Sequence, residues 1–122
     1  MRAESDADAR LRRKAEYSQA LRKMLKKRYG VLYDQVTLVL GEADPIGMGL
    51  ALDFNEYEPE AETILPRLTE CSSVQELEVV IYEEFCNWFS EEQASEPRVR
   101  EKFQPIAVKV WELWREFNKS QP

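Results

Sequence analysis

One internal stretch, Glu42–Ala61, constrains the fold most, because it must contain a turn. It holds two of the four glycines and two of the six prolines, and these residue types interrupt regular structure more strongly than any others. The flanking sequence is rich in helix formers. Nowhere does the chain combine strand-type alternation with a hairpin turn signal, so a sheet is not expected. The sequence therefore predicts an all-α fold, a single compact domain of about five helices over residues 1–122, with this stretch as a Gly/Pro-containing interhelical loop.

Apolar spacing and capping residues place the predicted helices. We expect a basic N-terminal helix in residues 1–30, a core carrying the loop motif in residues 31–90 and an amphipathic C-terminal helix in residues 95–119. The first helix stops at Gly30, a residue type common just past helix ends. Residues 31–40 contain strand-favouring Val and Thr, but without a second strand to pair with they fit one face of a helix better. Ser73 and Glu76 match the capping box, so a helix begins there.

Three prolines predict where helices start or are interrupted. Pro59 fits the first turn of a helix that runs to about Glu70, because a missing N–H costs nothing at that position. Pro66 lies inside this helix and predicts a kink or an early end near Leu65. Pro105 likewise interrupts the last helix.

The chain contains no histidine. This absence removes the commonest general base, the usual Ser-His and Cys-His nucleophile pairs and most catalytic zinc sites. We therefore expect a protein that is not an enzyme and that needs no cofactor.

The chain carries no apolar segment typical of a signal peptide or of a membrane span. Its N-terminus, MRAESDADARLRRK, is polar and charged, and its only two cysteines are Cys71 and Cys86. Lone cysteines in cytosolic proteins usually stay reduced. We expect a cytoplasmic protein with structural thiols and no membrane contact.

Charge is divided unevenly along the chain. Residues 1–28 carry ten Lys or Arg and four acids, a net charge of +6, whereas residues 29–122 carry seven bases and nineteen acids, a net charge of −12. The basic first helix raises the alternative of a nucleic-acid accessory protein that binds through Arg12, Arg13, Lys26 and Lys27. The overall pI of about 4.8 disfavours nucleic acid, because most of the surface repels phosphate.

The acidic loop raises a second alternative, a divalent-metal-binding protein or small metal-dependent enzyme using Asp44, Asp53 and Glu56. Hard cations prefer several oxygen ligands from one loop. The spacing does not match an EF-hand that begins at Asp53, since Glu58 replaces the required glycine and Ile64 stands where the bidentate glutamate belongs. Loop capping and solvation explain the clustered acids better, so we expect no metal site.

The loop also carries a motif that resembles a bacterial family of small helical proteins of unknown function. The motif is Asp44-Pro45-Ile46-Gly47 followed by Asn55-Glu56-Tyr57, and the similarity covers about Val31 to Phe89. Members often have an aromatic residue where Ala43 stands and an acid where Asn55 stands. The resemblance implies a small protein without an established activity, and similar acidic helical proteins occur as immunity proteins beside bacterial toxins.

The motif residues are our candidate binding site. They are Asp44, Pro45, Gly47, Asn55, Glu56 and Tyr57. Pro45 restricts Asp44 to extended geometry, Gly47 permits a positive φ, and Tyr57 can pack its ring while its hydroxyl bonds loop backbone. These residues either hold a rigid crossing between helices or form a ligand or partner site on that rigid loop.

Trp111 and Trp114 widen the apolar face of the last helix beyond what a surface helix needs. Core packing and partner contact both explain this excess. Taken together, the sequence predicts a non-catalytic interaction protein, immunity-like or regulatory, that binds a basic protein partner through its acidic surface, with a homo-dimer as a further option.

Overall fold

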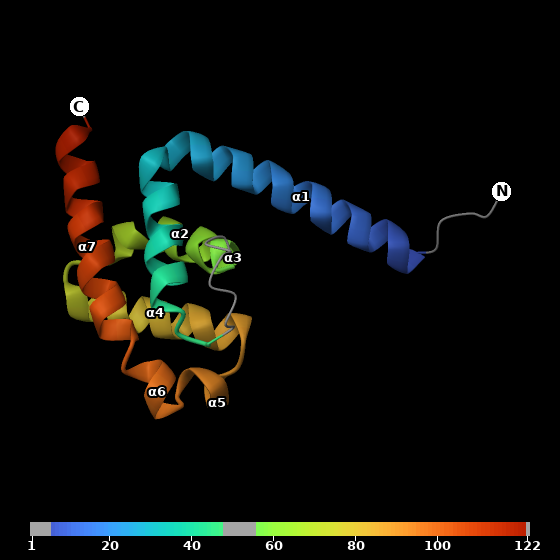
Figure 1. The fold of residues 1–122 in the computed structure, drawn as a ribbon. Coiled ribbons are helices and arrows are strands. Elements are labelled where there is room, and N and C mark those ends of the chain that lie inside the picture. The colour runs from blue at the N-terminus through green and yellow to red at the C-terminus, as the bar shows by residue number, and fades with distance from the viewer. Residues whose placement is uncertain (1–5, 48–55, 122) are drawn as a thin grey trace. The chain divides into compact units, whose positions relative to one another are not determined.

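The computed structural model confirms an all-α fold (Figure 1). It describes residues 6–47 and 56–121, with side chains from position 16 onward except 17. The chain divides into two compact units, residues 1–30 and 31–122, and each is described by itself. The prediction of one domain over residues 1–122 stays a prediction. In the described part of the chain, no helix combines the length and apolar character needed to cross a membrane.

The first unit contains the basic helix α1, Asp6–Tyr29. The helix ends as predicted at Gly30, whose φ is +55° and whose N–H donates to the Lys26 carbonyl over 2.8 Å. A left-handed residue at this position closes the last helical turn. Lys26 and Lys27 are exposed, as expected, whereas the side chains of Arg12 and Arg13 lie outside the described residues.

The second unit holds the remaining elements. They are α2 (Val31–Ala43), α3 (Glu58–Ile64), the 3₁₀ helix η1 (Leu65–Glu70), α4 (Val74–Trp88), α5 (Glu91–Ala94), α6 (Pro97–Arg100) and α7 (Phe103–Ser120). Within this unit α2 and α7 run side by side, and α4 packs across α7 (Figure 1). The prediction that residues 31–40 form a helix rather than a strand is confirmed.

Aromatic rings form the centre of this unit's core. The Phe85 ring of α4 lies 5.1 Å from the Phe103 ring of α7, measured between ring centroids. On another side it lies 6.0 Å from the ring of Tyr57, so the last residue of the loop motif belongs to the core. All three side chains are fully buried.

Prolines and caps shape the middle of the chain much as predicted. Pro59 lies in the first turn of α3, which ends at Ile64, and the chain continues through Pro66 as η1. The Glu76 N–H donates to Ser73 Oγ over 3.1 Å and caps α4. The Glu76 carboxylate, however, accepts from the N–H of Ser72 over 2.7 Å, one residue earlier than the capping box requires.

The helix expected over residues 95–119 is interrupted just ahead of Pro105, as that proline predicted. The chain forms the four-residue helix α6, a turn at Glu101 and Lys102, and then α7. Pro105 has no N–H to donate to the carbonyl of Glu101, four residues earlier, and its ring clashes with that carbonyl in a continuous helix. The helix therefore restarts at Phe103, which places Pro105 in the first turn of α7, where no donor is lost.

Candidate functional site

The Asp44–Gly47 part of the motif forms a tight corner after α2. Asp44 has a φ of +44°, so the predicted extended geometry at this residue is wrong. Its N–H donates to the Leu40 carbonyl over 2.9 Å, and its carbonyl accepts from the Gly47 N–H over 3.0 Å. Aspartate tolerates the left-handed region better than most residues, and this conformation both ends α2 and turns the chain.

Tyr57 holds this corner from inside the core. Its hydroxyl donates to Asp44 Oδ1 over 2.6 Å and accepts from the Ile46 N–H over 3.1 Å. Burial, then the hydrogen bond to Asp44, raises the pKa of Tyr57 above its ordinary value of 10.0, so the hydroxyl remains a neutral donor. The prediction that Tyr57 packs its ring and bonds loop backbone is confirmed.

A third residue ties the corner to a distant part of the chain. The Lys102 ammonium, in the turn between α6 and α7, donates to the Asp44 carbonyl over 3.3 Å. We call Asp44–Gly47 with Tyr57 and Lys102 the motif corner. It is fixed by α2, by the core and by the start of α7.

The other predicted site residues have different positions. Pro45 is buried and Glu56 is half-buried, and Gly47 has the expected positive φ, +77°. Asn55 and Asp53 lie outside the described residues. Among the residues that are described, no three Asp, Glu or Cys side chains are grouped so that they could hold a metal ion.

A pocket adjoins the motif corner, and sequence reasoning missed it. Its volume is about 500 Å³, and it is lined by Ile46, Ser90, Glu92, Gln93, Glu96 and Val99. Val99 is buried, whereas Glu92 and Glu96 are exposed. The pocket therefore has an apolar base and an acidic rim.

Two short helices form the far wall of this pocket. Ser90 Oγ accepts from the Gln93 N–H over 3.0 Å and starts α5. The Ser90-Glu-Glu-Gln93 spacing matches the capping box, so this pattern was the available signal for a helix here. The wall is attached to α4, because the hydroxyls of Tyr82 and Ser95 lie 2.6 Å apart and the Arg100 guanidinium lies 3.7 Å from the centre of the Tyr82 ring.

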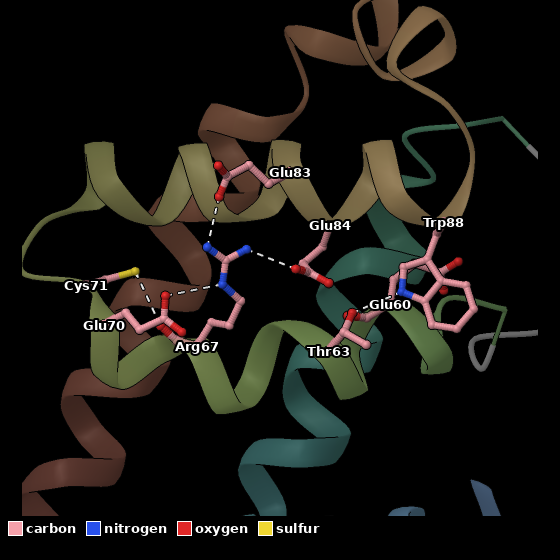
Figure 2. Close-up of polar contacts among 8 residues, drawn as sticks. All are labelled: Glu60, Thr63, Arg67, Glu70, Cys71, Glu83, Glu84 and Trp88. Carbon is pink, nitrogen blue, oxygen red and sulfur yellow. Dashed lines mark hydrogen bonds and ion pairs between the residues drawn. The ribbon is translucent and has the colours of Figure 1, made fainter.

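A second polar cluster joins η1 to α4 and was also missed (Figure 2). Its centre is Arg67, which contacts Glu83 over 2.8 Å, Glu84 over 2.9 Å and Glu70 over 3.3 Å. The hydrogen bond to Glu83, followed by those to Glu84 and Glu70, raises the pKa of Arg67. We call these four residues the Arg67 cluster.

Beside the Arg67 cluster lies a buried carboxyl group, Glu60 (Figure 2). Its side chain is nearly inaccessible, and its Oε2 has no hydrogen-bond partner. Burial raises the pKa of Glu60 above its ordinary value. Nearby, the indole N–H of Trp88 donates to Thr63 Oγ1 over 2.9 Å, which ties the end of α4 to α3.

Acidic residues of α3 also bond to α2. The Tyr33 hydroxyl lies 2.8 Å from Glu58 Oε2 and 3.1 Å from Glu62 Oε2, so its single proton is shared between two carboxylates. Burial, followed by the hydrogen bond to Glu58, raises the pKa of Tyr33. Two acids of α3 thus fix the packing of this helix against α2.

The two tryptophans proposed as partner contacts are half-exposed. The Trp114 ring stacks on Phe117, with centroids 5.7 Å apart and an interplanar angle of 15°. Neither Trp111 nor Trp114 lines the pocket beside the motif corner. A second groove of about 360 Å³ between α2 and α7 is lined by Val39, Lys109, Glu112, Leu113 and Glu116. A partner contact at the tryptophans stays a prediction.

Comparison of the chain with models of protein families, with curated proteins and with solved structures finds no match. The resemblance carried by the Asp-Pro-Ile-Gly and Glu-Tyr residues stays a prediction.

Proposed function

We propose that the protein is a bacterial, cytoplasmic interaction module that binds a basic protein partner, in an immunity-like or regulatory role, without catalysis. The observation that carries this proposal is the pocket beside the motif corner. Its lining combines the exposed acids Glu92 and Glu96 with the apolar side chains Ile46 and Val99. A basic partner offers the matching charge, and apolar contact at the base adds affinity.

Charge over the second unit supports the same proposal. Residues 31–122 carry seven bases and nineteen acids, a net charge of −12. A field of one sign steers an oppositely charged partner toward the surface and speeds association at low ionic strength.

The polar groups of the motif corner support a structural rather than a chemical role for the motif. The Tyr57 hydroxyl already bonds Asp44 and Ile46, and its raised pKa makes it a poor acid at neutral pH.

The two cysteines also support a role without catalysis. Both are free thiols, and burial, followed by the charges of Glu76 and Glu70, raises the pKa of Cys71. Such a thiol is a weak nucleophile, and reduced cysteines suit a cytoplasmic protein.

The test is affinity capture from the native host with the tagged full chain at its native level. We expect a stoichiometric partner of high pI, with an affinity that falls steeply between 50 and 300 mM NaCl, because exposed charges are screened. The purified pair is then titrated by calorimetry. The proposal would be overturned if the capture recovered only the protein itself. It would also be overturned by an acidic partner whose affinity does not depend on salt concentration.

A further inference from the structure

We infer that the pocket beside the motif corner receives one arginine side chain of the basic partner. This inference rests on the proposed function and assigns the residue type and the place of contact. The pocket, about 500 Å³, falls in the roughly 300–1,000 Å³ range of small-ligand sites.

The lining of the pocket matches the two parts of an arginine. Ile46 and Val99 offer apolar surface to the three methylene groups, and Glu92 and Glu96 offer carboxylates to the guanidinium. Long cationic side chains commonly bury their stems while the charged head stays near water. Because the guanidinium is planar and carries five donors, it can bond two carboxylates at once, whereas a lysine ammonium acts as a point charge.

The acids on the rim are available to such a cation. Among the described residues, neither Glu92 nor Glu96 forms an ion pair. Three basic residues follow these glutamates closely along the chain. Arg100 lies on the Tyr82 ring and Lys102 bonds the Asp44 carbonyl, and Arg98, the nearest, forms no ion pair with any described residue. Both glutamates are exposed, so a partner can reach them without rearrangement of the fold.

The walls of the pocket are fixed before any partner arrives. On one side the Tyr57 hydroxyl accepts from the Ile46 N–H and holds this residue in place. On the other side the pair Tyr82 and Ser95 attaches the segment between α5 and α6 to α4. A preformed pocket avoids the entropy loss of ordering loops on binding. The motif corner thus acts as a positioning element, with Ile46 as its contribution to the contact.

The first experiment uses blocked pentapeptides, Gly-Gly-Arg-Gly-Gly and its lysine and citrulline counterparts, against the ¹⁵N-labelled full chain. We expect the arginine peptide to shift the amide signals of Ile46, Gln93 and Val99 at low salt. Citrulline has a similar shape without the charge and should leave them unmoved. Equal shifts with lysine would overturn the choice of arginine, and shifts confined to other residues would overturn the pocket.

The second experiment measures the captured partner against two matched double variants. Glu92→Gln with Glu96→Gln removes the acidic rim, and we expect affinity to fall about tenfold, the combined effect of two partly exposed charge pairs. Glu112→Gln with Glu116→Gln removes two exposed acids of the other groove and should change affinity less than about twofold. All four substitutions are at exposed positions, and thermal melting checks that each variant folds.

The two proposals fail in different ways. If no basic partner binds the unaltered chain, the proposed function falls. If a basic partner binds equally well to the chain lacking Glu92 and Glu96, the proposed function stands and the pocket is not the contact.

Discussion

The motif corner and the Arg67 cluster both join helices of the second unit through polar side chains, but they do so by different physics. Tyr57 is fully buried and neutral, and it bonds one carboxylate and one backbone N–H. Arg67 is charged, its side chain is 27% exposed, and two of its three carboxylate partners are at least half exposed. The buried junction should therefore be the stronger, because water and salt weaken exposed ion pairs.

The motif corner and the Arg67 cluster also differ in whether they adjoin the pocket. The motif corner fixes Ile46 at the edge of a pocket, whereas the Arg67 cluster fixes η1 against α4. A rigid corner beside an open pocket suits recognition. The Arg67 cluster stabilises a helix contact and lines neither the pocket nor the groove.

The largest effect should come from Tyr57→Phe. The substitution leaves the Ile46 N–H and the Asp44 carboxylate without their shared partner, so we expect the free energy of unfolding to fall by about 2 kcal/mol. Urea denaturation followed by circular dichroism measures this loss. Tyr82→Phe is the control, because it removes a similar hydroxyl bond at an exposed position and should cost less than about 0.5 kcal/mol. Equal losses in the two variants would contradict the comparison.

Arg67→Met should have the next largest effect, a loss of about 1.5 kcal/mol at low salt. Most of it comes from Glu84, whose side chain is only 11% exposed and loses its cation. Because the bonds to Glu70 and Glu83 are exposed, the loss should shrink in 1 M NaCl, whereas that of Tyr57→Phe should not. Lys119→Met breaks a fully surface pair with Glu116 and serves as the control. A salt-independent loss would count against this account of the cluster.

Glu60→Gln should stabilise the fold by about 1 kcal/mol at pH 7, since burial of a carboxyl whose Oε2 has no hydrogen-bond partner makes its ionisation costly. Burial raises the pKa of Glu60 above 4.5 in the folded state, so its protonated form favours folding below that pH, and this stability is lost as pH rises through the folded-state pKa. The difference between variant and native chain should therefore be smallest below pH 4.5 and grow as the pH rises. Denaturation series across pH measure it, with Glu78→Gln as control. If the difference in the free energy of unfolding between the two chains did not change with pH, this account of Glu60 would be refuted.

The smallest effect should come from Gly47→Ala. A side chain at φ +77° is strained, but reduced freedom in the unfolded chain offsets part of the cost, leaving a net loss of roughly 0.5 to 1 kcal/mol. Gly30→Ala is the matched variant, because its φ is +55° and an added Cβ meets nothing within 4 Å at either position. Similar losses are expected by thermal melting. If Gly47→Ala lost much more stability than Gly30→Ala, the positive φ of Gly47 would not be the only reason that the motif corner requires glycine at this position.

Several features of the fold were predictable because their causes lie within a few residues of one another. The stop at Gly30 and the end of α3 before Pro66 follow from local backbone chemistry. The Ser73 cap follows from a side chain that reaches an N–H three residues later. The role of Tyr57 was predictable for a related reason, since a tyrosine next to a Gly/Pro turn can bury its ring and bond nearby backbone.

The sequence by itself determined the longer helices, the end of α1 at Gly30, the Ser73 cap and the division of charge between residues 1–28 and 29–122. Only the tertiary structure decided the left-handed Asp44, the Arg67 cluster and the pocket that joins Ile46 to Glu96 and Val99. Pairs such as Arg67 with Glu84 or Lys102 with Asp44 are separated by 17 and 58 residues. No local periodicity encodes such pairs, because they arise only when packing of the core brings separate helices into contact.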